Sequence, residues 1–454
     1  MYRNKLDYLK KWQKKSNRKP LIIRGARQVG KSYLVRELGR EFDDYLEINF
    51  EKNPELASLF VDSPVKTVEF LEARFEKKIV PEKTLLFLDE IQSAPQVLPK
   101  LRYFYEELPG LHVIAAGSLL EFLLREHDFS MPVGRVEYLY LGPMDFEEFL
   151  IAGGQDHLKK WISEFQIGED VPLALHDKAM EWVRNFLLVG GMPEVVKHYG
   201  ESRDLGLCDE IKQSVLIAYQ DDFAKYGRKI NVDRVRKVYR KIPNLLGKKL
   251  VYAKIDPQEK AKDLALALEL LHQARICYKV HHTSASGLPL AAQVNDKIFK
   301  LIHLDVGLVT SSLGMGLIDL HNQPDLNLIC QGALTEQFVG QELLYAGAPY
   351  QQPELHYWVR EKNNAAAEVD FVIAVEGKVI PIEVKSGKTG RLRSLHVFME
   401  EKKSSLAVRI NGDKPSLTRT NSALAGNKTS FPLLSIPLYL TGQLMRLIGK
   451  IQHE

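Results

Sequence analysis

Over the first 150 residues, short apolar runs alternate with stretches in which apolar positions recur every three or four residues. Buried parallel strands read as continuous apolar runs, and the helices that cover them read as amphipathic stretches, so the alternation predicts a parallel sheet covered on both faces. The expected strands are 21–25, 45–50, 84–90, 112–118 and 135–144. The expected helices are 5–15, 31–42, 65–78 and 98–107.

The pattern changes further along the chain. Residues 145–228 lack strand-like runs and read as helices that end at glycines. After them, two amphipathic helices (about 232–246 and 260–274) precede two strand-like runs (276–281 and 297–304), which suggests a winged helix. From about residue 325 a helix is followed by strands again. The expected domains are 1–150, 151–229, 230–322 and 323–454.

Composition narrows the class of protein. A chain of 454 residues is too long for one hydrophobic core. The 62 basic and 58 acidic side chains leave a net charge of +4, too balanced to indicate a nucleic-acid partner alone. The three cysteines are far apart, which favours a reducing compartment and argues against a zinc site. The chain shows no targeting segment and no apolar run of the about 18 residues that a membrane span needs, so we expect a cytoplasmic protein without a membrane segment.

A glycine-bounded loop, GARQVGKS, follows the first expected strand and matches G-x-x-x-x-G-K-S. Its glycines allow backbone N–H groups to turn toward phosphates, and the N-terminus of the next helix favours negative charge. Lys31 can reach the outer phosphates, and the Ser32 hydroxyl can hold Mg²⁺. The alternative is a surface turn. We predict an ATP site at Gly25, Ala26, Arg27, Gln28, Val29, Gly30, Lys31, Ser32 and Tyr33.

The run TLLFLDE supports this site. Four apolar residues predict a buried strand, and Asp89 at its carboxyl end would face the crevice where ligands bind in such sheets. Asp89 would hold the Mg²⁺ shell together with Ser32, and Glu90 would polarise the attacking water. The alternative is a strand that simply ends in surface acids.

The order of these strands resembles the additional-strand, catalytic-glutamate class of P-loop ATPases, specifically the AAA superfamily. The resemblance makes Ser118 a polar sensor, although a serine there is as well suited to cap a helix. Arg135 would sense the γ-phosphate or reach into a neighbouring subunit, which implies a homo-oligomer; the alternative is a solvated arginine. The resemblance would place Pro193, in the motif GGMP, near the base of the nucleotide. The alternative is that the motif simply breaks a helix.

The motifs GARQVGKS, LLFLDEIQ, AAGSLLEFLL, LGPMDFEEFL and GGMPEVV together resemble prokaryotic AAA-type ATPases whose C-terminal half is domain of unknown function 4143. LDVGLV, GALTEQFVGQELL, LHYWVRE, EVDFVI and IPIEVKSG extend this resemblance over nearly the whole chain.

The last section contains a second candidate site. Glu383 and Lys385 alternate along one strand and therefore share a face, and antiparallel pairing would bring Asp370 beside them. With Glu336 on the preceding helix, these residues resemble the PD-(D/E)xK pattern of the restriction-endonuclease-like superfamily, which implies a second Mg²⁺ or Mn²⁺. Lys388, Arg391 and Arg393 follow and would meet phosphates. The alternative is a solvated cross-strand ion pair.

The expected fold class is therefore α/β: an AAA-type P-loop ATPase core with a parallel sheet, a helical lid, a winged-helix-like section and a C-terminal α/β restriction-endonuclease-like domain. One hypothesis is an ATP-hydrolysing protein that acts on or with DNA through this last domain. The competing hypothesis is a nucleotide-gated switch that recruits a protein partner and has an inactive C-terminal domain.

Overall fold

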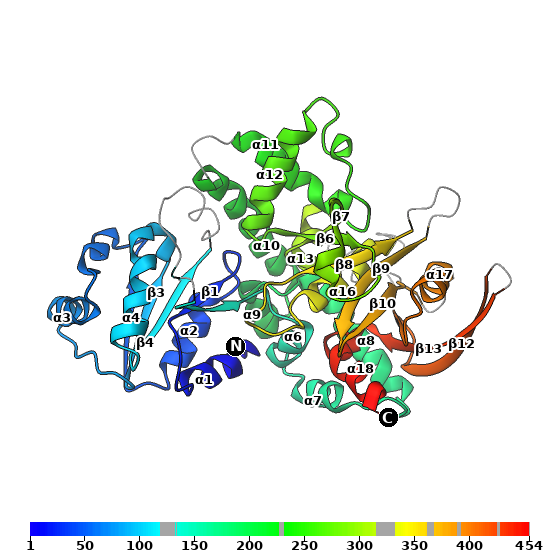
Figure 1. The fold of residues 1–454 in the computed structure, drawn as a ribbon, viewed down its shortest axis with the longest axis horizontal. Helices are drawn as coiled ribbons and strands as arrows, with labels where there is room; N and C mark the ends of the chain where they lie inside the picture. The colour runs from blue at the N-terminus through cyan, green and yellow to red at the C-terminus, as the bar shows by residue number, and fades with distance from the viewer. Residues whose placement is uncertain are drawn as a thin grey trace.

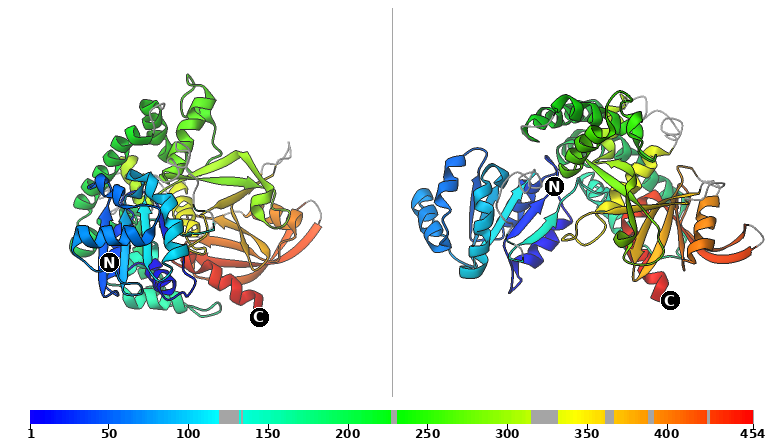
Figure 2. Two further views of the ribbon diagram at one scale, coloured as in Figure 1. Left: turned by 60° about the vertical axis from the view of Figure 1, so that its left-hand side comes forward. Right: turned by 45° about the horizontal axis from the view of Figure 1, so that its top comes forward.

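Two β-sheets joined by a layer of helices make up the chain (Figure 1). The computed structural model describes residues 1–118, 132, 134–226, 231–314, 332–360, 367–387, 392–424 and 427–453. The N-terminal sheet lies on the left of Figure 1 and the C-terminal sheet on the right, and Figure 2 shows the same separation from two further directions.

The N-terminal sheet has five strands in the order β2-β3-β4-β1-β5, and every neighbouring pair is parallel. All five strands predicted from the apolar runs form, and the central two are buried along their whole length. The elements are α1 (Lys5–Gln13), β1 (Leu21–Arg24), α2 (Lys31–Gly39), β2 (Asp44–Asn49), η1 (Pro54–Leu59), α3 (Pro64–Phe75), β3 (Thr84–Asp89), η2 (Ile91–Ser93), η3 (Pro95–Lys100), α4 (Leu101–Glu107), β4 (His112–Gly117) and β5 (Glu137–Tyr140).

Helices cover both faces of this sheet, as predicted. Leu21 and Ile23 of β1 point into the core formed with α1 and α2, whereas Ile22 between them points into a separate core with α3 and α4. Only the first of these cores continues into the rest of the chain. The apolar core shared by the N-terminal domain and the other described domains therefore lies on one face of its sheet.

The middle of the chain is helical up to residue 274, as its glycine-punctuated pattern predicted. Its elements are α6 (Phe146–Ala152), α7 (Asp156–Glu164), α8 (Leu173–Val189), α9 (Pro193–Ser202), α10 (Leu205–Asp222), η4 (Phe223–Tyr226), α11 (Val232–Lys241), η5 (Ile242–Leu245), η6 (Tyr252–Lys254) and α12 (Ala261–Gln273). Within the described ranges, no helix has both the length and the apolar character to cross a membrane.

The C-terminal sheet is mixed and has eight strands in the order β12-β13-β11-β10-β9-β8-β6-β7. The elements are β6 (Cys277–Thr283), η7 (Leu290–Gln293), β7 (Val294–His303), α13 (Val306–Ser312), α16 (Ala333–Leu344), β8 (Leu355–Val359), β9 (Glu368–Val375), β10 (Lys378–Val384), α17 (Arg393–Lys402), β11 (Ala407–Asn411), β12 (Ser416–Leu424), β13 (Asn427–Pro437), η8 (Leu438–Gln443) and α18 (Leu444–His453).

The hairpin expected as the wing of a winged helix belongs to this sheet. β6 and β7 pair with each other, but β6 also pairs in parallel with β8, with Val280 beside Leu355. The sheet thus crosses the expected boundary between residues 322 and 323. The physical reason is visible in burial: the end of β7 is buried on both faces, whereas a wing has one solvated face.

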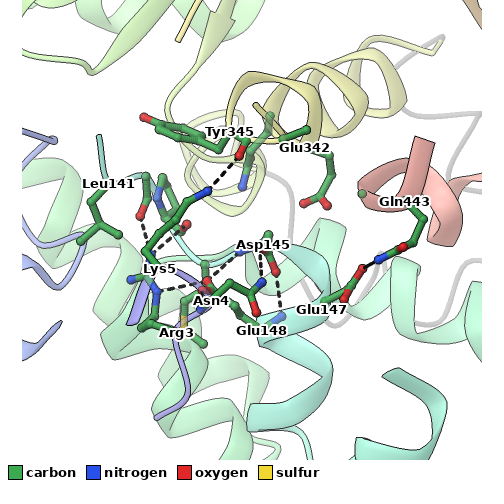
Figure 3. A pocket seen from close by; sticks show the side chains of 16 residues that line it. Arg3, Asn4, Lys5, Leu141, Asp145, Glu147, Glu148, Glu342, Tyr345 and Gln443 are labelled. Carbon is green, nitrogen blue, oxygen red and sulfur yellow. Dashed lines mark hydrogen bonds and ion pairs between the residues drawn. The ribbon is translucent and has the colours of Figure 1, made fainter. Parts of the chain in front are cut away.

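A cavity of about 240 Å³ lies where the N-terminus and α6 meet α16 and η8 (Figure 3). Four carboxylates line it: Asp145, Glu147, Glu148 and Glu342. Arg3 Nε lies 3.1 Å from Glu148 Oε2, yet burial raises the pKa of Glu148 to about 7. Glu342 Oε1 accepts a hydrogen bond from the Phe146 amide at 3.1 Å, and burial raises the pKa of Glu342 well above its ordinary value. The two halves of the chain therefore meet across acids that resist ionisation.

We predict that Glu342→Gln stabilises the protein at pH 8. The Glu342 carboxyl keeps its proton in the folded protein but loses it above pH 4.5 in the unfolded chain. Glu342 therefore makes the free energy of unfolding fall as pH rises beyond 4.5. Glutamine retains a carbonyl acceptor for the Phe146 amide and cannot ionise. The thermal unfolding midpoint at pH 8 should rise by about 2–4 °C, which corresponds to about 1 kcal/mol in a large domain. Glu354→Gln, at an exposed position, is the control. Equal pH profiles for wild type and Glu342→Gln would contradict the prediction.

Candidate active site

The glycine-bounded loop lies at the carboxyl end of β1 and leads into α2. Gly25 leaves no room for a side chain, because a Cβ atom there would lie 2.2 Å from the Leu141 carbonyl oxygen. Gln28 and Gly30 have positive φ angles of 62° and 89°. Where residues with positive φ alternate with residues with negative φ, the backbone is concave and its N–H groups can surround an anion.

Lys31 and Ser32 are the first two residues of α2. Lys31 Nζ donates to the carbonyl oxygens of Gly25 at 3.1 Å and Ala26 at 2.7 Å, so the ammonium lies over the loop. Ser32 Oγ donates to Asp89 Oδ2 at 2.9 Å. Hydroxyl and carboxylate oxygens are the ligand types that Mg²⁺ takes, so Ser32 and Asp89 fit the predicted magnesium site.

Asp89 ends β3 and is buried. Burial raises its pKa, the nearby Glu90 carboxylate adds to the rise, and the Ser32 hydroxyl opposes it. Asn49, at the end of the neighbouring strand β2, donates to the same Asp89 oxygen at 3.4 Å. The sequence analysis missed Asn49, although its position at a strand's carboxyl end was a signal. Glu90 is half-buried beside Asp89 and accepts a hydrogen bond from Gln92 Nε2.

Ser118 follows β4 directly, at the same edge of the sheet. The last residue of β4, Gly117, lies beside Arg24, the last residue before the loop. Ser118 is buried, and its Oγ makes no hydrogen bond to any residue that the structure describes. Residues 119–131, which a cap would serve, lie outside the described residues. Its role as a sensor or a cap therefore stays a prediction.

Arg135 lies away from the loop. At the start of β5, Glu137 lies beside Leu21, the first residue of β1, whereas the loop follows the last residue of β1. The Arg135 guanidinium is bound to Glu106 at 2.7 Å and lies over the Tyr105 ring. The structure thus does not bring Arg135 to the loop of its own chain. Two of the predicted roles are compatible with this position: a contact with a neighbouring subunit, or a solvated arginine.

The helical region touches the loop at two points. Arg27 is ion-paired with Asp222 at the end of α10, and Tyr219 OH donates to the Arg27 carbonyl oxygen at 2.7 Å. Pro193, the first residue of α9, lies beside Gly30: a Cβ atom on this glycine would be 3.5 Å from Pro193 Cγ. Sequence analysis expected Pro193 near the nucleotide base through the GGMP motif, and this stays a prediction. It had no signal for the pairing of Arg27 with Asp222.

The N-terminus also packs against the loop. Arg3 Nη1 donates to the Val29 carbonyl oxygen at 2.7 Å, and Nη2 donates to the Gly142 carbonyl oxygen at 2.8 Å. Tyr33 OH donates to the Met1 carbonyl oxygen at 3.0 Å. Arg3 is only 4% exposed, so its contacts are fixed by packing. Sequence analysis treated this basic segment as the start of a covering helix and missed Arg3.

The second predicted site does assemble in the C-terminal sheet. Ile382 of β10 pairs with Phe371 of β9, so Asp370 and Glu383 are the next pair in register. Asp370 Oδ2 accepts a hydrogen bond from the amide of residue 384 at 2.8 Å. Lys385 Nζ lies 2.6 Å from Glu383 Oε1. Lys388 and Arg391 lie outside the described residues, and Arg393 is exposed at the start of α17.

The fourth predicted residue, Glu336 of α16, reaches this cluster through a lysine that sequence analysis missed. Lys300 Nζ on β7 lies 2.8 Å from Glu336 Oε1, 2.6 Å from Glu368 Oε1 and 3.6 Å from Asp370 Oδ1. Among the residues that the structure describes, no group of three or more Asp, Glu, His or Cys side chains is arranged to hold a metal ion. The four predicted residues converge, but the expected metal does not fit the cluster as it stands.

We predict that Arg3→Ala weakens ATP binding about tenfold, because it removes two hydrogen-bond donors from the loop and its neighbour and leaves Glu148 buried without its cation. Charge-assisted hydrogen bonds contribute about 1.5–3 kcal/mol each, and tenfold is about 1.4 kcal/mol. Calorimetric titration with ATP and Mg²⁺ measures the change. Arg18→Ala is the matched control, since Arg18 is equally buried but binds Gly110 and Glu82 at the other end of the sheet. Wild-type affinity in Arg3→Ala would rule out a role in shaping the loop.

Three family models match consecutive parts of the chain. Residues 17–150 match an AAA domain, residues 180–318 a domain of unknown function (DUF8612) and residues 331–427 a domain of unknown function (DUF4143). No curated protein matches the chain.

Solved structures resemble the chain only distantly. The Walker-type ATPase PABY2304 of Pyrococcus abyssi is 17% identical with a TM-score of 0.43, over 68% of this chain and 94% of that one. The ORC2 protein of Aeropyrum pernix, in its ADPNP–ADP complexes, is 12% identical with a TM-score of 0.35, over 70% of this chain and 94% of that one. The family matches therefore carry the conclusion: by homology, the chain contains an AAA-type P-loop ATPase domain followed by DUF8612 and DUF4143 domains.

Proposed function

We propose that the chain binds ATP in the loop Gly25–Ser32 and hydrolyses it to ADP and phosphate. The observation that carries this proposal is the hydrogen bond between Ser32 and Asp89, with Glu90 beside it at the same sheet edge. ATP and its Mg²⁺ would lie between the positively charged loop on one side and the carboxylates of Asp89 and Glu90 on the other.

Each side chain has one task in this reaction. Lys31 neutralises charge on the outer phosphates, and the α2 N-terminus and loop amides bind the remaining phosphate oxygens. Ser32 and Asp89 would hold Mg²⁺, which when bound offsets phosphate charge. Glu90 accepts a proton from the water that attacks the γ-phosphate, and ADP leaves. Ser118 would bind that water or a γ-phosphate oxygen through its otherwise unbonded hydroxyl.

The loop contacts with α9 and α10 would pass the nucleotide state to the helical region. Arg27 can bind either Asp222 or the phosphates, because one guanidinium cannot satisfy both at full strength. ATP that attracts Arg27 would release the end of α10, and hydrolysis would restore the ion pair. The helical region thereby acts as the lid predicted from sequence.

We also propose that the ATP site is completed by a neighbouring subunit in a homo-oligomer. Arg135 is 44% exposed and lies at the sheet edge opposite its own loop, so it is presented to a neighbour rather than to its own nucleotide. Its partner Glu106 is a surface carboxylate, and an exposed pair of this kind contributes little stability and can exchange partners.

DNA is the candidate ligand for the C-terminal domain. The observation that favours it is the convergence of Glu336, Asp370, Glu383 and Lys385, which the restriction-endonuclease-like pattern predicted. The competing hypothesis, a switch for a protein partner with an inactive C-terminal domain, is favoured by the presence of Lys300 within the same cluster.

We predict that Lys31→Ala loses ATP binding, whereas Glu90→Gln retains binding and loses at least about 99% of turnover, since general-base catalysis contributes about 10²–10⁴-fold. Calorimetry and phosphate release, each with and without single-stranded or duplex DNA, separate the two effects. Stimulation of wild-type turnover by DNA supports the DNA proposal. A Glu90→Gln variant at the wild-type rate would remove Glu90 as the base.

We predict that Arg135→Ala binds ATP normally but turns it over at least about tenfold more slowly. A mixture of the Arg135→Ala and Glu90→Gln proteins should hydrolyse ATP faster than the sum of their separate rates. In a mixed oligomer, a site with an intact Glu90 can lie beside a neighbour with an intact Arg135. Arg102→Ala is the control, since Arg102 binds the same Glu106. A fully active monomer by light scattering would contradict this assembly.

A further inference from the structure

We propose that Lys300 is a built-in cation of the C-terminal carboxylate cluster, so that this cluster takes no divalent metal and the domain does not cut nucleic acid. The ion-pair part of this inference stands alone. Only its consequence for nucleic acid rests on the proposed role of DNA.

The carboxylates converge on the lysine rather than on an empty centre. Glu336 comes from α16, Glu368 and Asp370 come from β9, and Lys300 Nζ lies 2.8, 2.6 and 3.6 Å from one oxygen of each. The lysine itself comes from β7, in the hairpin that joins the C-terminal sheet. Carboxylates from two chain segments are thus arranged around an ammonium group from a third.

The ammonium occupies the space that a metal would need. A divalent ion binds carboxylate oxygens at about 2.0–2.6 Å. Lys300 Nζ already lies 2.8 Å from a Glu336 oxygen and 3.6 Å from an Asp370 oxygen, and both residues are predicted metal ligands. Placing both cations among the same oxygens would bring like charges into contact in a buried site. The metal can therefore enter only if Lys300 leaves or loses its charge.

Lys300 can do neither easily. Its side chain is 1% exposed, and Nζ lies 5.1 Å from the centre of the Tyr357 ring, which favours a cation further. Burial alone would lower the pKa of Lys300, but Glu336, Asp370 and Glu368 outweigh burial and raise it. The three carboxylates around Lys300 therefore favour its charged form.

The other half of the cluster is also paired internally. Lys385 Nζ binds Glu383 Oε1 at 2.6 Å, and Asp370 Oδ2 is bound to the backbone of β10. Glu383 Oε2 is buried and makes no hydrogen bond to any described residue. This oxygen is the feature that a metal would have used, and burial raises the pKa of Glu383, as does the nearby Asp370 carboxylate.

Substitution of Lys300 tests the inference directly. Without it, Lys385 is the cation that the described residues leave to Glu336, Glu368, Asp370 and Glu383, so Lys300→Met should create a divalent-cation site. We expect Lys300→Met to bind one more Mn²⁺ per chain than wild type, or to bind it at least tenfold more tightly, by electron paramagnetic resonance of free Mn²⁺. Adding Asp370→Asn should remove the gain. All proteins carry Asp89→Asn and contain no nucleotide, so the P-loop site does not contribute.

Lys279→Met is the matched control, because Lys279 is a largely buried lysine on the adjacent strand that pairs with Glu269 outside the cluster. A folded Lys300→Met variant, by circular dichroism, that gains no Mn²⁺ overturns the inference. If this variant does not fold, Mn²⁺ binding by wild type is compared with binding by Asp370→Asn and Glu336→Gln. Equal binding by the three proteins supports the inference. A Mn²⁺ that wild type binds and both variants lose overturns it.

Incubation of wild type with single-stranded, duplex and branched DNA in Mg²⁺ or Mn²⁺ tests the consequence. No cutting is expected, and cutting that Asp370→Ala removes would overturn the inference. DNA binding measured in the same samples by fluorescence anisotropy is a separate readout. Its absence would remove the DNA proposal and leave the Mn²⁺ result unaffected.

Discussion

Helix α16 is buried on nearly every side, and this burial constrains the rest of the molecule. A buried polar group costs free energy unless it is hydrogen-bonded, so each polar side chain of α16 must find a partner. Gln337 accepts from the His303 amide at 2.7 Å, and Gln341 accepts from the Val306 amide at 2.8 Å. These two bonds attach the end of β7 and the start of α13 to the helix. The hairpin is thereby held against α16 within the C-terminal sheet.

The same helix links the two candidate sites. Its first turn carries Glu336 into the Lys300 cluster, and its last turn carries Glu342 to the first amide of α6. Gln341 also binds Asp305, which accepts a hydrogen bond from the Gly191 amide at 2.6 Å, two residues before Pro193. Coupling between sites needs an element with two arrangements. α16 is fixed at both ends, so the element that moves must lie nearer the nucleotide, where Arg27 can exchange partners.

Local patterns were sufficient to predict much of the fold and the placement of the glycine-bounded loop beside Asp89. The five strands follow from apolar runs, and the contact of Ser32 with Asp89 follows from both lying at the carboxyl ends of parallel strands. Lys300 and Arg3 could not be found this way. Lys300 lies within an apolar strand run and Arg3 within a polar segment, and the partners of each are at least 26 residues away in the sequence. The hairpin was misplaced for the same reason, because its partner β8 is distant in sequence.

Convergence of acids and lysines is thus not evidence of metal chemistry by itself. Two arrangements satisfy the same buried carboxylates: a divalent ion from solvent, or a lysine from the chain. The first leaves a vacant, loosely held site in the free protein, whereas the second rigidifies the sheet at all times. In this chain the lysine lies on the hairpin that joins the C-terminal sheet, and its main partner lies on α16. This ion pair connects the hairpin to the helix that also contacts the ATPase domain. A C-terminal domain held in this way is suited to transmit the nucleotide state to a bound partner, and the switch hypothesis accounts for Lys300 where the nuclease hypothesis does not.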